Sequence, residues 1–152
     1  MNSNTRWGWW LLTLASLGWL LWMTLRPDST PNQINLIPLA EHGQALACLI
    51  SGACASRQVF WFLLIDVAGN IVVFMPLGIG LAGIWPGQNG RQTILRAALL
   101  GLLVSLTIEL TQLTIPSRAT DIDDSIFNTA GTTLGAIMFV AVQQKKLSPG
   151  DP

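Results

Sequence analysis

Two carboxylates stand inside long apolar segments of this chain. Asp66 is the only charged residue of segment 59–85, and Glu109 is the only acidic residue of segment 94–115. An ionisable group in a membrane-spanning segment is costly, so it usually marks a functional site and needs a polar partner. Glu109 is therefore a candidate general acid or base, provided that a substrate can reach it.

A short polar stretch follows the second of these segments. Residues 116–125 contain Arg118, Asp121, Asp123 and Asp124. Asp121 and Asp124 join Glu109 as candidate catalytic residues, and their oxygens could hold Mg²⁺ or another hard cation. Arg118 could anchor an anionic group, or it could form a purely structural pair with Glu109. Asp123 or Asp124 could instead cap the next helix.

Polar residues recur at helical spacing within the apolar segments. Residues three and four apart share one helix face, and this spacing connects polar positions in three segments. The candidate ligand-binding residues are Asn70, Glu109, Gln112, Arg118, Asp121, Asp124 and Asn128. The alternative for Asn70, Gln112 and Asn128 is hydrogen bonding between helices. Gly131 and Gly135 form a stripe of small residues that would let two helices approach closely.

The elements that must position these residues are four membrane-spanning helices. Of 152 residues, 51% are hydrophobic and only 11% are charged, which excludes a disordered chain. Segments 7–25, 59–85, 94–115 and 126–142 are long enough to cross a bilayer as helices. We therefore predict an all-α, four-span membrane protein, a single domain over residues 1–152. Because the only adjacent basic residues are Lys145 and Lys146, we expect no nucleic-acid partner.

The distribution of basic residues favours one orientation. With both termini inside, five Lys and Arg residues face the cytoplasm and three face outward, as the positive-inside rule requires. Tryptophans near the ends of the first two segments fit a membrane–water interface. We expect the first segment to be retained as a span, because no small-residue cleavage site follows it. Asp66, Glu109 and loop 116–125 then lie toward the outer leaflet.

The first loop, residues 26–58, contains a second apolar stretch. Residues 45–55 are too few to span, so we expect an interfacial or re-entrant segment. Cys48 and Cys54 either form a disulfide, if the loop is extracytoplasmic, or remain buried thiols. We expect His42 to be a solvated loop residue. Since it is the only histidine, neither a histidine metal site nor a Ser-His-Asp triad is expected.

Several of these motifs, in this order, resemble the VanZ-like family of small bacterial membrane proteins. The resemblance rests on four pieces: Asn35-Leu36-Ile37-Pro38, Asn70-x3-Phe74-x-Pro76-Leu77-Gly78, Ser105-x3-Glu109-x2-Gln112, and Arg118-x2-Asp121-x2-Asp124-x3-Asn128-x2-Gly131-x3-Gly135. Together they cover about residues 34–136. The resemblance implies a multi-pass protein of the bacterial plasma membrane. The name-giving member is linked to teicoplanin resistance, but the resemblance implies no molecular activity.

Three functional hypotheses follow. The first is binding or modulation of a cell-envelope component, such as a lipid-linked or cell-wall ligand, at the polar site in the outer leaflet. The second is a membrane-embedded, carboxylate-dependent hydrolase or transferase acting on a lipid-linked phosphate or ester. The third is a purely structural helix bundle. No cofactor is expected beyond the candidate cation at Asp121 and Asp124.

Overall fold

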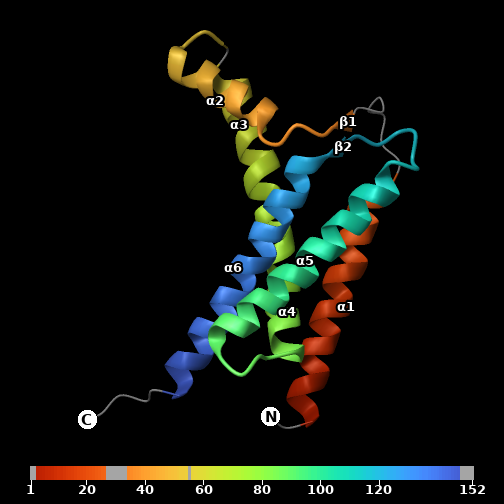
Figure 1. Ribbon diagram of the computed structural model, residues 1–152, viewed down its shortest axis with the longest axis vertical. Helices are drawn as coiled ribbons and strands as arrows, with labels where there is room; N and C mark the ends of the chain where they lie inside the picture. Colours follow the sequence, from red (N-terminus) through yellow and green to blue (C-terminus); the bar gives the residue numbers. More distant parts are fainter. Residues whose placement is uncertain (1–2, 27–33, 55, 148–152) are drawn as a thin grey trace.

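The computed structural model describes residues 3–26, 34–54 and 56–147 (Figure 1). The elements in chain order are α1 (Ser3–Leu25), β1 (Ile34–Asn35), α2 (Ala40–Ser51), α3 (Ser56–Leu63), a π-helical turn η1 (Leu64–Ala68), α4 (Gly69–Ile84), α5 (Gly90–Gln112), β2 (Thr120–Asp121) and α6 (Ile122–Leu147).

Among the described residues, four helical segments are long and apolar enough to cross a membrane, as predicted. They cover Arg6–Leu25, Ser56–Ile84, Gly90–Gln112 and Ile122–Lys145, and the second is formed by α3, η1 and α4 together. The third span, helix α5, ends at Gln112, so residues 113–115 of the predicted span 94–115 lie outside the helix. Large apolar side chains such as Trp7, Leu11 and Leu103 are more than half exposed, as expected for a surface covered by lipid.

The bundle is held together around α4 and α6. Phe74, Leu77 and Ile108 are among the side chains buried between the helices. The predicted stripe of small residues is used within the chain: a Cβ at Gly131 would overlap the carbonyl oxygen of Ile71, and one at Gly135 that of Met75. These glycines therefore let α6 approach the backbone of α4 closely.

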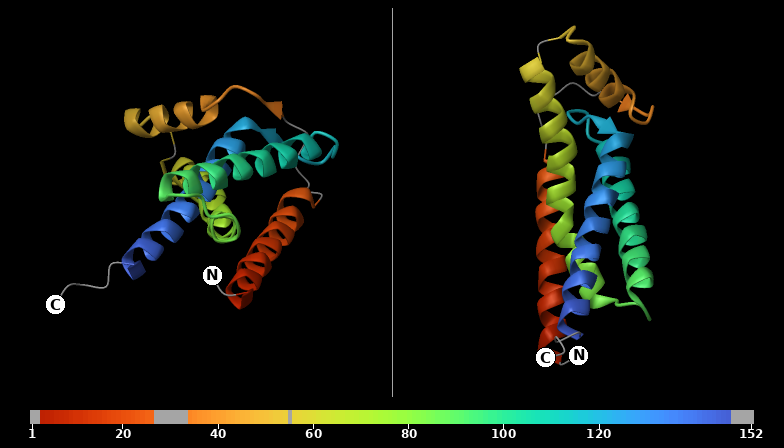
Figure 2. Two further views of the ribbon diagram at one scale, coloured as in Figure 1. Left: turned by 60° about the horizontal axis from the view of Figure 1, so that its bottom comes forward. Right: turned by 90° about the vertical axis from the view of Figure 1, so that its left-hand side faces the viewer.

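The end of the molecule opposite the start of α1 contains a strand pair that the all-α prediction missed and a helix in the first loop, where a short segment was predicted (Figures 1 and 2). β1 and β2 form a two-stranded parallel pair, with Ile34 opposite Thr120 and Asn35 opposite Asp121. The apolar stretch of the first loop is helix α2, which is joined to the segment before α3 by a Cys48–Cys54 disulfide. Of the two alternatives for Cys48 and Cys54, a disulfide or buried thiols, the structure has the disulfide.

Candidate functional site

The short strand pair brings the first loop to the start of α6. Asn35 donates its side-chain amide to both carboxylate oxygens of Asp121, at 3.2 and 3.3 Å. Asp121 in turn accepts a hydrogen bond from the backbone N–H of Asp123 at 2.9 Å. Because Asp121 directly precedes α6, it is the residue that caps this helix. The capping role proposed for Asp123 or Asp124 is therefore wrong.

Glu109, near the end of α5, contacts the β2 strand at Asp121. Its side chain is buried, and Oε2 accepts a hydrogen bond from the backbone N–H of Asp121 at 3.1 Å. Two candidate catalytic residues, Glu109 and Asp121, are thus adjacent, although they meet through the backbone rather than side chain to side chain. This contact positions the β2 segment between α5 and α6.

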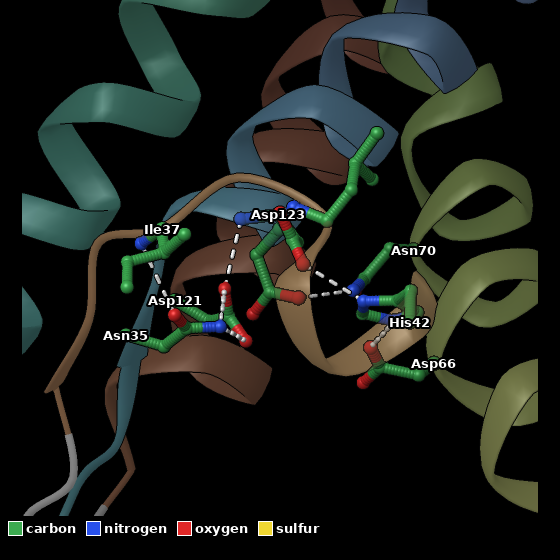
Figure 3. A network of polar contacts seen from close by, with 9 residues as sticks. Asn35, Ile37, His42, Asp66, Asn70, Asp121 and Asp123 are labelled. Carbon is green, nitrogen blue, oxygen red and sulfur yellow. Dashed lines mark hydrogen bonds and ion pairs between the residues drawn. The ribbon is translucent and has the colours of Figure 1, made fainter. Parts of the chain in front are cut away.

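His42 lies at the centre of the polar network (Figure 3). Its Nδ1 is 2.8 Å from Oδ2 of Asp123, and its Nε2 is 2.8 Å from Oδ2 of Asp66. The expectation of a solvated loop residue is wrong, because His42 lies on α2 and is only 7% exposed. A carboxylate at each ring nitrogen suits the doubly protonated ring, in which both nitrogens are donors.

The protonation of His42 reflects opposing effects. Burial lowers its pKa, but the hydrogen bonds to Asp123 and Asp66 and their negative charges outweigh it, so the pKa lies above the ordinary value of 6.5. The two carboxylates differ in their surroundings. The side chain of Asp123 is fully buried, whereas that of Asp66 is 34% exposed. His42 therefore connects a buried anion to a partly exposed one.

The conformation of Leu39, just before α2, helps to place His42 beside Asp123. Leu39, the residue that precedes α2, has a φ of 58°, a left-handed conformation that is costly for a side chain branched beyond Cβ. Its backbone N–H donates to Oδ1 of Asp123 at 2.6 Å, which holds this conformation. The His42 ring then stacks on Phe62 and meets Phe127 edge-on. Asp123 thus fixes both the start of α2 and the position of the His42 ring.

The remaining predicted residues divide into two groups. Asn70 on α4 donates to Asp124 Oδ1 on α6 at 2.6 Å, so these two belong to the network, and their contact is also a hydrogen bond between helices. Gln112 donates instead to the Thr24 carbonyl, and Asn128 donates to Ser105 Oγ, which supports the alternative of hydrogen bonds between helices. Arg118 is half-buried in the segment between α5 and β2.

The carboxylates of the site are held by hydrogen bonds. Within the described residues, no group of three or more His, Cys, Asp and Glu side chains is placed to hold a metal ion. Asp121 accepts from Asn35 and from a backbone N–H, and Asp124 accepts from Asn70. The carboxylates thus serve as hydrogen-bond acceptors, and the candidate cation gains no support from their geometry.

Sequence reasoning missed three members of the network: Asn35 as a partner of Asp121, and the pair of His42 and Asp123. A usable signal existed for His42. A carboxylate within a span, such as Asp66, needs a partner, and His42 was one of the few basic side chains on the same side of the predicted topology.

Comparison with known families agrees with the motifs. The profile of the VanZ/LLP1 family matches residues 8–143. The chain belongs to the VanZ/LLP1 family. The match runs from α1 to α6 and so includes the whole polar network. The resemblance seen in the motifs is thereby confirmed, and several VanZ-like motif residues, including Asn35, Asn70, Asp121 and Asp124, are the ones that contact each other here. Neither a curated protein nor a solved structure matches the chain.

Proposed function

We propose that this VanZ/LLP1 protein binds and modulates a component of the cell envelope at the polar site, which we define as Asn35, His42, Asp66, Asn70, Glu109, Arg118, Asp121, Asp123 and Asp124. The observation that carries the proposal is the gathering of five carboxylates from three spanning helices and β2 at one end of the bundle. Such groups are costly near a bilayer and are kept there chiefly for function.

The polar site contains buried residues, which we call its frame, and partly exposed residues, which we call its rim. Glu109, His42 and Asp123 are buried, whereas Asp66, Asn70, Asp121 and Asp124 are only partly covered. A buried frame of this kind holds the rim groups in fixed positions, which favours selective binding of a polar ligand. Gln112 and Asn128, which connect helices, serve this frame; we propose that any role toward a ligand is limited to their amide oxygens.

Binding is better supported than catalysis. A general base needs a free lone pair, but both nitrogens of His42 face carboxylates. The hydrolase hypothesis would therefore have to rely on Glu109, Asp121 and Asp124 alone. The two polar contacts of Asp121, with Asn35 and with the Asp123 backbone, serve the fold, so a reaction would have to depend on Glu109 and Asp124.

We also propose that the polar site faces the outside of a bacterial plasma membrane, with both termini in the cytoplasm. The Cys48–Cys54 disulfide lies at the same end as the site, and disulfides persist in oxidising compartments. The excess of Lys and Arg at the other end supports the same orientation.

An isosteric substitution tests the proposed function. In Asp124→Asn, the new amide oxygen can still accept the hydrogen bond from Asn70, so the carboxyl group is replaced while this contact is kept. We expect the membrane level of the protein to stay normal while its effect on growth with teicoplanin and other cell-wall antibiotics disappears. As a structural control, Ser105→Ala removes the acceptor for Asn128 and should lower the protein level. Full antibiotic response in Asp124→Asn, Arg118→Gln and Glu109→Gln at normal level would refute the proposal.

A further inference from the structure

An apolar groove runs between α2 and the α3–η1 segment and ends at His42. Its volume is about 610 Å³, and His42 is the one polar side chain among the residues that line it. Leu46 of α2 and Phe60 and Leu64 of the opposite wall are each more than 40% exposed. The volume lies within the range of about 300–1,000 Å³ that is typical of small-molecule pockets. We call this feature the α2–α3 groove.

The position of the groove identifies hydrocarbon as its natural occupant. One wall, α3 with η1, is the first part of the membrane-spanning segment Ser56–Ile84. The exposed Phe60 and Leu64 of this wall would be costly to leave in water, so an apolar occupant is favoured. A lipid chain gains little by moving from bilayer to groove, because both are apolar. Selectivity for one lipid over another must therefore come from the end of the groove at His42, which we call its polar end.

The charges at the polar end favour a cation. Two carboxylates, Asp66 and Asp123, face the single imidazolium of His42, so this end carries an excess of negative charge. Asp123 is fully buried, but the side chain of Asp66 is 34% exposed and contacts His42, which lines the groove. Asn70, one helical turn after Asp66, donates a hydrogen bond to Asp124 of α6, which adds one more carboxylate.

We propose that the α2–α3 groove binds an acyl chain of a phospholipid with an amine head group, of the phosphatidylethanolamine class, with the ammonium directed to Asp66. The proposal deepens the proposed function, on which it rests, by naming the class of ligand that the polar site takes. It also gives α2 a role: the helix forms one wall of the groove and brings His42 to its end.

Photo-cross-linking in nanodiscs of phosphatidylcholine tests the groove directly. The probe is phosphatidylethanolamine with a diazirine on one acyl chain, and peptides are mapped by mass spectrometry. We expect labelling to concentrate on residues 39–49 and 60–68. A labelling pattern no stronger there than on the α1–α5 face around Leu21 and Leu103, which forms a second apolar hollow, would overturn the proposal.

Glycine offers a matched pair of variants. A Cβ at Gly43 meets no atom within 4 Å and Gly43 lines the groove, so Gly43→Leu should fill the groove without disturbing the fold. Gly18 on α1 is equally open, so Gly18→Leu is the control. We expect Gly43→Leu to reduce labelling of the groove at least tenfold and Gly18→Leu to leave it unchanged. Leu46→Trp narrows the groove from another position and should act as Gly43→Leu does. Unchanged labelling in both groove variants, with the disulfide and protein level intact, would refute the proposal.

The head group is tested with the same acyl probe on phosphatidylglycerol. We expect wild-type protein to prefer the amine probe about fivefold, which corresponds to about 1 kcal/mol for a partly exposed ion pair, and Asp66→Asn to lose the preference. Equal labelling by the two probes in wild type would refute the amine assignment. The proposed function and the proposed lipid ligand can be refuted independently. If labelling of the groove fails while Asp124→Asn loses the antibiotic response, only the lipid ligand is contradicted. Successful labelling with a full response in that variant contradicts only the proposed function.

Discussion

Replacing His42 by Phe is the perturbation whose effect on stability follows most directly from the structure. Phe keeps an aromatic ring between Phe62 and Phe127 but removes both donors. Asp123, fully buried, then keeps only the Leu39 N–H and its own negative charge. Removing one partner of a buried ion pair typically costs about 3–5 kcal/mol, because the remaining charge is left uncompensated. We expect a loss of this size in the free energy of unfolding.

Two further variants locate the cost at Asp123. In the double variant His42→Phe with Asp123→Asn, the buried charge is gone while an amide oxygen can still accept from Leu39, so much of the stability should return. Asp66→Asn alone should cost less than about 1 kcal/mol, as a partly exposed pair does. The assay is reversible unfolding in mild detergent, followed by tryptophan fluorescence, with the disulfide kept oxidised. A loss below about 1 kcal/mol in His42→Phe, or no recovery in the double variant, would refute this reasoning.

Three further outcomes are expected. Because the pKa of His42 is raised, its stabilising effect should be complete below pH 6.5 and decline as pH rises through the raised value, so unfolding curves of wild type and His42→Phe should converge toward alkaline pH. Replacing Cys48 and Cys54 by Ser should cost about 2 kcal/mol of unfolding free energy by the loop-closure relation for a ring of this length, and an unchanged midpoint would contradict a formed disulfide. Gly131→Ala should cost about 1–3 kcal/mol through overpacking against α4, whereas Gly18→Ala, in open space, should change the thermal midpoint little; equal effects would count against the close helix contact.

The spanning helices could be predicted because the bilayer imposes a simple constraint. A segment in hydrocarbon must satisfy its own backbone hydrogen bonds, so length and apolar composition are enough to define it. The close approach at Gly131 and Gly135 was predictable from helical spacing for a similar reason. What spacing leaves open is the partner helix, and the structure identifies it as α4.

The site was harder to predict because its contacts join distant parts of the chain. Asn35 and Asp121 are 86 residues apart, and His42 and Asp123 are 81 apart. A strand of two residues has no periodicity to detect, so the β1–β2 pair that aligns these segments leaves no signal in the sequence. Local patterns also assigned the cap of α6 to the wrong aspartates, since three candidates lie within four positions and only tertiary contacts distinguish them.

The proposed function depends most on the polar site facing the outside of the cell, and cysteine labelling measures this directly. In a Cys48→Ser, Cys54→Ser background, Ala119→Cys places a thiol on the exposed segment beside β2, and Gln88→Cys places one on the exposed segment between α4 and α5 at the other end. With a membrane-impermeant maleimide on intact cells, we expect labelling of Ala119→Cys, and of Gln88→Cys only after permeabilisation. Labelling of Gln88→Cys in intact cells, with Ala119→Cys protected, would place the site in the cytoplasm and contradict the proposed orientation.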